Sequence, residues 1–219
     1  MNLSLDEYRA LVAKAFRGVG YPWGLIEDAS WAARRLAEID RRSPTAVLSL
    51  LEQVDQLDPA STPVLAGMPV STSAPTWSSD GDALCPVCVG TTLLDRGPVS
   101  LGEAIVLGPT RTPALLVPFL YELIASAVDA LVVDWGEGTF RLSAGQTELT
   151  GGSPEIVDSV TIRLDPKSAA EYGADAQQNW RVRLEHGQME QFEKYAHRTY
   201  APATEASRQG AGAGTTDND

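Results

Sequence analysis

Residues 131–143 read LVVDWGEGTFRLS, and this stretch decides the class of fold. Leu131, Val133 and Trp135 alternate with Val132 and Asp134, which is the two-residue period of a strand with one buried face. A turn at 136–138 follows, and residues 139–143 alternate again. Two alternating runs around a glycine turn predict an antiparallel hairpin.

Further strand patterns lie downstream of the hairpin. Residues 146–150 predict one strand, and residues 156–164 predict another, with Val160, Ile162 and Leu164 on one face. Residues 180–184 predict a last strand, in which apolar residues alternate with Arg181 and Arg183. An antiparallel meander is the simplest arrangement, followed by a helix from about 188 to 198.

The first third of the chain has the helical period instead. Ser4 and Glu7 have the spacing of a capping box, and apolar residues follow at intervals of three and four until Gly18. A second amphipathic pattern covers residues 25–39. A third helical pattern follows, in which Ser43 is expected to be the N-cap and Pro44 the first helical residue.

The middle of the chain is less regular. Residues 59–82 are rich in proline and hydroxyl side chains and predict a long connection wrapped over the body of the protein. A helix over 82–94 and a strand over 104–107 follow. Residues 112–113 could begin a helix, or residues 114–117 could run extended into a helix over 118–128.

These patterns predict an α+β fold, with an N-terminal helical layer, an antiparallel sheet and a C-terminal helix followed by an extended tail. We expect one domain over residues 1–219. Its parts are a helical part (1–58), an irregular connection (59–82), a mixed and β part (83–200) and a tail (201–219).

Composition narrows the class of function. The formal net charge is −12, and the 17 Lys and Arg residues are scattered along the sequence, so we expect no nucleic-acid partner. The apolar stretch 113–133 is broken by Pro118, Glu122 and Asp129, which argues against a bilayer span, and we expect no membrane partner. No basic segment with a following apolar run opens the chain, so a cytoplasmic location is expected.

Cys85 and Cys88 form a C-x-x-C motif, whose meaning depends on its context. A structural zinc site needs four ligands, and His186 and His197 are too far apart in sequence to share a metal on one helix. A thioredoxin-like redox pair would stand after a strand at the start of a helix, and that context is not evident here. Two buried, apolar side chains are the favoured interpretation, and no metal or cofactor is expected.

Two segments could build a functional surface. Tyr21 and Trp23 flank a proline at a helix start, where large rings either line pockets or cover the edge of a core. The last 23 residues mix small side chains with arginines, hydroxyls and carboxylates, although a chain end of this kind is often only a solvated tail.

Residues 18–29, GVGYPWGLIEDA, and residues 198–219, from RTYAP to TTDND, resemble a family of small bacterial proteins known only as a domain of unknown function. The resemblance is expected to cover the whole chain. It implies no activity and no catalytic residues, and the C-x-x-C motif is not a feature of that family.

Two hypotheses of function follow. The first is a small-molecule enzyme or binding protein for carboxylate-type ligands, in which Glu205 could act as a base. Its ligand-binding residues would be Tyr21, Trp23, Tyr200, Thr204, Ser207 and Arg208. The second is a non-catalytic accessory or oligomerising subunit, whose C-terminal segment docks on a protein partner or on a second copy of the chain.

Overall fold

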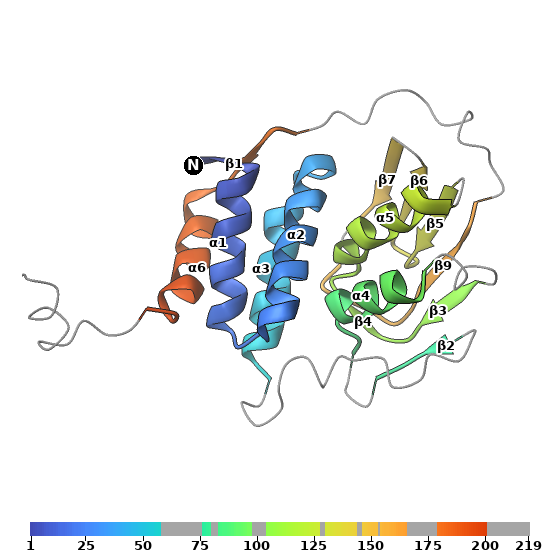
Figure 1. Ribbon diagram of the computed structural model, residues 1–219, viewed down its shortest axis with the longest axis horizontal. Helices are drawn as coiled ribbons and strands as arrows, with labels where there is room; N and C mark the ends of the chain where they lie inside the picture. Colours follow the sequence, from blue (N-terminus) through green and yellow to red (C-terminus); the bar gives the residue numbers. More distant parts are fainter. Residues whose placement is uncertain are drawn as a thin grey trace, which may run out of the picture.

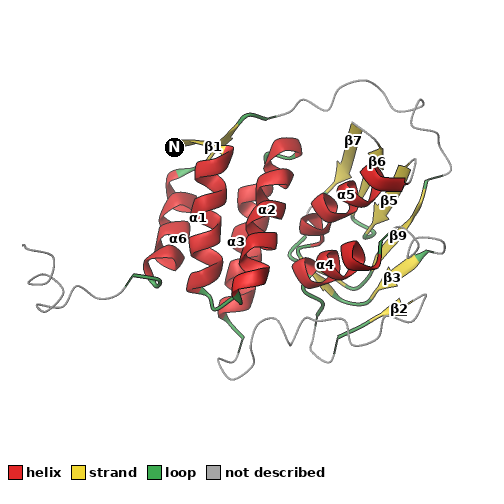
Figure 2. Cartoon of the chain, viewed as in Figure 1, coloured by secondary structure: helices red, strands yellow, loops and turns green. Residues whose placement is uncertain are grey.

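The computed structural model describes residues 1–57, 76–79, 83–97, 104–127, 130–143, 146–152, 154–165 and 179–200. Within these ranges the chain is α+β, as the sequence predicted, and the N-terminal helices are confirmed. The helices stand together, and the longer strands gather at one end of the molecule (Figures 1 and 2). The expected wrapping connection and the tail lie mostly or wholly outside the described residues.

Three helices open the fold. They are α1 (Leu5–Gly18), α2 (Trp23–Ile39) and α3 (Ser43–Asp55). The predicted capping box is present, because Glu7 N donates to Ser4 Oγ at 3.2 Å and Ser4 N donates to the Glu7 carboxylate at 2.7 Å. The predicted N-cap of α3 is wrong by one residue, since Arg42 is the N-cap. Ser43 is buried and donates its hydroxyl to the carbonyl of Ala33 at 2.9 Å, so its side chain joins two helices.

The last helix, α6 (His186–His197), returns to this helical layer and packs on α1 and α3. Gly18 of α1 makes the close approach possible, because a Cβ there would overlap the backbone carbonyl of Tyr195. On the other side, α2 packs against α4 (Pro86–Arg96) and α5 (Val117–Ala127). Figure 1 shows the resulting order across the molecule, from α6 and α1 through α2 and α3 to α4, α5 and the strands.

The main sheet of the described residues has six strands in the order β2-β3-β9-β5-β6-β7. They are β2 (Thr76–Trp77), β3 (Ile105–Leu107), β9 (Val160–Leu164), β5 (Ala130–Asp134), β6 (Gly138–Ser143) and β7 (Gln146–Gly151). The predicted hairpin is β5 and β6, and β7 continues it as a meander. Because β9 pairs with β5 and β3, the sheet is not a simple sequential meander.

Two small sheets tie distant segments together. In one, β1 (Asn2–Ser4) pairs with β10 (Arg181–Arg183); in the other, β4 (Thr110–Arg111) pairs with β8 (Ile156–Val157). The predicted strand 156–164 is therefore two strands, β8 and β9, and the predicted last strand is not part of the main sheet. The extended alternative for 114–117 is wrong, because Pro113–Leu116 form a 3₁₀ turn that leads into α5.

One apolar core runs from the helical layer to the sheet. It includes Phe16 of α1, Leu36 of α2 and Phe119 of α5, together with Phe140 and Ile162 of the main sheet. No described helix is long and apolar enough to cross a membrane.

Candidate functional site

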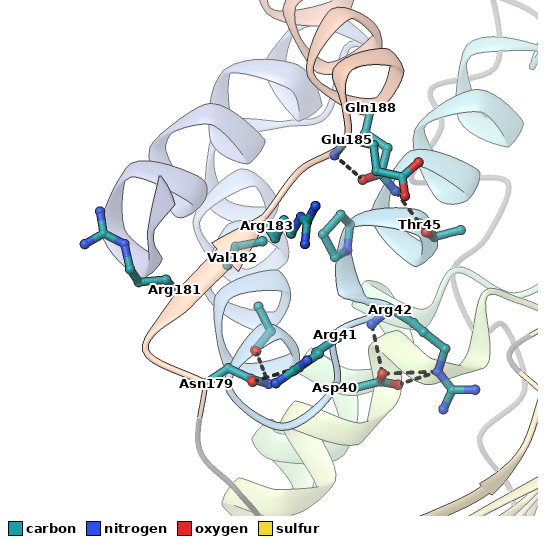
Figure 3. A pocket seen from close by; sticks show the side chains of 12 residues that line it. Asp40, Arg41, Arg42, Thr45, Asn179, Arg181, Val182, Arg183, Glu185 and Gln188 are labelled. Atoms are coloured by element: carbon teal, nitrogen blue, oxygen red, sulfur yellow. Dashed lines mark hydrogen bonds and ion pairs between the residues drawn. The ribbon is translucent and has the colours of Figure 1, made fainter. Parts of the chain in front are cut away.

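A pocket of about 590 Å³ lies where the turn between α2 and α3, the strand β10 and the start of α6 meet. Its polar side chains are drawn in Figure 3. They come from both ends of the chain: Asp40, Arg41, Arg42 and Thr45, and Asn179, Arg181, Arg183, Glu185 and Gln188. Four arginines in one pocket make it locally basic on a chain whose net charge is −12.

The α2–α3 turn is held by its own polar groups. Asp40 accepts hydrogen bonds from the backbone N–H of Arg42 at 2.9 Å and from Arg42 Nε at 3.1 Å. A carboxylate that bonds to the backbone two residues on is the usual device of an Asx turn. The turn therefore fixes Arg42 beside Asp40 and presents Arg41 on its exposed side (Figure 3).

The C-terminal segment is fastened to the same place. Asn179 donates its backbone N–H to Glu38 O at 2.8 Å and its side-chain amide to Ala37 O at 3.2 Å, so it covers the last carbonyls of α2. Val182 is buried between the exposed Arg181 and Arg183, because alternate residues of a strand face opposite ways. Figure 3 shows Arg183 near the centre of the pocket and Arg181 pointing away from the other lining side chains.

The start of α6 closes the pocket. Glu185 and Gln188 form a capping box, in which Gln188 Oε1 accepts the backbone N–H of Glu185 at 3.1 Å. The amide of Gln188 also donates to Thr45 Oγ1 of α3 at 3.1 Å. The second of these bonds links α6 to α3 at the pocket (Figure 3).

The positive charges of the pocket are only partly neutralised. Arg42 is paired with Asp40 at 3.1 Å. In the described part of the chain, no carboxylate lies within 4.0 Å of a guanidinium nitrogen of Arg41 or Arg183. Arg41 instead donates to the neutral side chain of Asn179 at 3.4 Å. Such groups can bind an anion, because guanidinium forks match carboxylate oxygens.

Of the residues that the sequence predicted as a site, the three within the described ranges do not line the arginine pocket. Tyr21 is only 4% exposed, whereas Trp23 is 68% exposed and lies under the guanidinium of Arg17, 4.2 Å from the ring centroid. Tyr200 lines a separate surface pocket between α1 and α6, whose lining includes neither Tyr21 nor Trp23. Thr204, Glu205, Ser207 and Arg208 are outside the described ranges, so a ligand site or a base in the tail stays a prediction.

Sequence reasoning missed the arginine pocket. The signals were the doublet Arg41-Arg42 between two helical patterns and the pair Arg181 and Arg183 on one face of a strand. They are far apart in sequence, and only the docking of β10 beside α2 brings them together.

The two cysteines form a second polar cluster, buried in the core. Each is 2% exposed, and they are not joined by a disulfide. The Tyr21 hydroxyl lies 3.2 Å from Cys85 Sγ. A hydrogen bond from the Cys88 thiol is the main cause that lowers the pKa of Cys85 to about 6, and the same bond raises the pKa of Cys88.

Comparisons with known proteins cover the N-terminal helices alone. No curated protein and no solved structure matches the chain. The matching family description is "Protein of unknown function (DUF3726)". The matched residues include the α2–α3 turn of the arginine pocket but not β10. The resemblance to a domain of unknown function that the sequence predicted is thus confirmed over residues 3–65, whereas its extension over the whole chain, including residues 198–219, stays a prediction.

Proposed function

We propose that this protein is a cytoplasmic binding protein for small molecules that carry two or more carboxylates. The observation that carries the proposal is that Arg41 and Arg183 line the same pocket. Among the described residues, neither of them forms an ion pair with a carboxylate. An anion with two acidic groups would provide the missing counter-charges.

The other lining groups suit such a ligand. Thr45, Asn179 and Gln188 provide neutral donors and acceptors, which fix the orientation of a polar ligand in a pocket. A volume of about 590 Å³ is within the range of small-molecule sites. Asp40 and Glu185 also line the pocket, so a ligand that bears a hydroxyl or ammonium group beside its carboxylates would find acceptors there.

The test is isothermal titration calorimetry of the full chain with citrate, succinate and inorganic phosphate at constant ionic strength. Citrate and succinate are expected to bind, and the variant Arg183→Gln is expected to weaken binding about tenfold or more, because a hydrogen bond to a charged group contributes roughly 1.5–3 kcal/mol. Arg41→Gln should have a similar effect.

The matched control is Arg9→Gln, which removes an exposed arginine of α1 that does not line the pocket. It should leave the affinity unchanged while altering the net charge by the same amount. Equal affinities for Arg9→Gln and Arg183→Gln would contradict the proposal, as would the absence of binding by either carboxylate. In that case a non-catalytic accessory or oligomerising subunit becomes the better proposal, and the oligomeric state measured on the same samples would test it.

A further inference from the structure

The Cys85-Pro86-Val87-Cys88 motif stands at the beginning of a helix. Cys85 is the N-cap of α4, Pro86 is its first residue, and Cys88 lies in its first turn. The residue before the motif, Leu84, forms a parallel bridge with Thr110 and exchanges backbone hydrogen bonds with Pro109 and Arg111. The motif therefore follows an extended segment and starts a helix, which is the local context that its sequence alone did not reveal.

The surroundings favour the thiolate form of Cys85 and the protonated form of Cys88. Cys85 receives hydrogen bonds from the Cys88 thiol and the Tyr21 hydroxyl, and backbone N–H groups of the first helical turn also favour its thiolate. The hydrogen bond to Cys85, together with burial, raises the pKa of Cys88 and so favours its protonated thiol. An anion at the start of a helix is further stabilised by the aligned peptide dipoles. One sulfur is thus prepared as a nucleophile and the other as a proton-bearing partner.

A buried cation completes the cluster. Arg111 is 6% exposed, and its guanidinium donates a hydrogen bond to the carbonyl of Ala83. No carboxylate within the described ranges forms an ion pair with it. Its charge acts on Tyr21, whose hydroxyl touches Cys85. Negative charge on the Cys85 side of the cluster would compensate this cation, which a pair of inert, apolar thiols would not do.

We propose that Cys85 and Cys88 are a redox-active dithiol that reduces small hydroperoxides, with Cys85 as the attacking sulfur and Cys88 as the resolving sulfur. In the first step the Cys85 thiolate attacks one oxygen of the peroxide and the O–O bond breaks. With one proton taken up, the products are Cys85 sulfenic acid and water, or an alcohol from an organic hydroperoxide.

In the second step the Cys88 sulfur attacks Cys85 Sγ. The S–O bond of the sulfenic acid breaks, a disulfide forms, and the leaving hydroxide takes the Cys88 proton to become water. The net reaction oxidises two thiols to one disulfide and reduces the peroxide by two electrons. An external dithiol would regenerate the pair by thiol–disulfide exchange.

Burial sets the class of oxidant. Because each thiol is 2% exposed, a small peroxide can reach Cys85 far more easily than a bulky aromatic disulfide can. The reaction should therefore be fast with hydrogen peroxide and slow with a reagent such as dithionitrobenzoate. This selectivity separates the site from an exposed, unspecific cysteine pair.

The experiment treats the reduced, folded, full-length chain with hydrogen peroxide and measures its mass and its peptide map. Since the chain has two cysteines, the expected product is a single intramolecular disulfide between Cys85 and Cys88, with the loss of two hydrogen atoms and full reversal by dithiothreitol. An unchanged mass, or oxygen added to a cysteine without the disulfide, would overturn the proposal.

Two variants test the separate roles of the sulfurs. Cys88→Ser should accumulate a sulfenic acid at Cys85 that dimedone traps, whereas Cys85→Ser should leave Cys88 unmodified under the same exposure. The reverse pattern would overturn the assignment of the attacking sulfur. If either variant fails to fold, the disulfide mapped in the wild-type chain, and its faster formation with hydrogen peroxide than with dithionitrobenzoate, still decide the proposal.

Discussion

The carboxylate of Asp40 holds both the backbone and the side chain of Arg42, with oxygen-to-nitrogen distances of 2.9 Å to the N–H and 3.1 Å to Nε. Asp40 thereby shapes the turn at the arginine pocket and at the same time neutralises one of its cations. The two roles can be separated, because an asparagine in place of Asp40 keeps an oxygen for the backbone N–H but loses the charge.

We therefore predict that Asp40→Asn binds dicarboxylates more tightly than the wild-type chain does. An ion pair of this exposure contributes on the order of 1 kcal/mol, so the dissociation constant should fall roughly fivefold. Calorimetry with citrate measures it. The control is Asp158→Asn, an exposed carboxylate that does not line the pocket and should leave the constant unchanged. An unchanged or weaker affinity in Asp40→Asn would argue against an anion site here.

Gly90 is expected to be essential for packing between α4 and α5. A Cβ at this position would overlap the ring of Phe119, which is fully buried. Gly90→Ala should lower the free energy of unfolding by about 1–3 kcal/mol, despite the better helix propensity of alanine. Urea unfolding followed by tryptophan fluorescence measures the loss.

Gly24 provides the matched control for that substitution. It is also a helical glycine, but a Cβ there would meet no atom within 4 Å. Gly24→Ala should be neutral or slightly stabilising, by up to about 1 kcal/mol. If both variants lost the same stability, the contact with Phe119 would not be the cause.

Local patterns were sufficient to predict much of the fold. The capping box of Ser4 and Glu7 and the hairpin at 131–143 depend on residues close in sequence, and both are confirmed. Pairings across long separations left no such signal. β1 pairs with β10 from the opposite end of the chain, and β9 inserts between β3 and β5, so the order of the sheet could not be read from alternation alone.

The candidate site was missed for the same reason. Arg41 was a charge on the edge of one helical pattern, and Arg183 was a charge on the polar face of a short strand. Neither indicates a ligand alone, since exposed arginines are usually solvated. The two arginines come to line one pocket only because Asn179 fixes the C-terminal segment on the last carbonyls of α2. Similarly, the helix predicted over 82–94 begins only at Pro86, and the extended segment before Cys85 is too short to leave a clear strand pattern.

Asp55 and Arg198 should give the stability a measurable dependence on pH. Arg198 donates two hydrogen bonds to the Asp55 carboxylate and so joins the ends of α6 and α3. This bonding is the main cause that lowers the pKa of Asp55. Since the folded state holds the carboxylate ionised, the contribution is present above the ordinary pKa of about 3.9 and is lost as the pH falls through the lowered value.

A double-mutant cycle with Asp55→Asn and Arg198→Gln measures that contribution as a coupling energy in urea unfolding. We expect roughly 0.5–1 kcal/mol at about pH 7, because both side chains are partly exposed, and a coupling energy that declines as the pH falls through the lowered pKa of Asp55. The cycle also cancels the energy of the separate contact between Arg198 and the ring of Tyr195, because this contact is lost both in Arg198→Gln alone and in the double variant. A coupling energy that persisted in acid would show that the charge of Asp55 is not its source.

Tyr21 should tune the reactivity of the dithiol without taking part in electron transfer. Its hydroxyl lies 3.2 Å from Cys85 Sγ and favours the thiolate, which helps to lower the pKa of Cys85 to about 6. Tyr21→Phe keeps the ring packed on Phe16 and removes only the hydroxyl. The pKa of Cys85 should rise, and the thiolate absorbance should titrate at higher pH than in the wild-type chain.

Peroxide oxidation of Tyr21→Phe should then be slower than that of the wild-type chain near neutral pH. The two oxidation rates should become equal once the pH exceeds the pKa of Cys85 in both proteins, because Cys85 is then almost fully ionised in each. Tyr8→Phe is the matched control, since it removes another fully buried hydroxyl, one that lies 3.3 Å from Ser43 Oγ instead of a thiol. It should cost comparable stability and leave the titration of Cys85 unchanged. If the two variants shifted the titration equally, the effect would come from a general loosening of the core, and Tyr21 would have no specific influence on the thiolate.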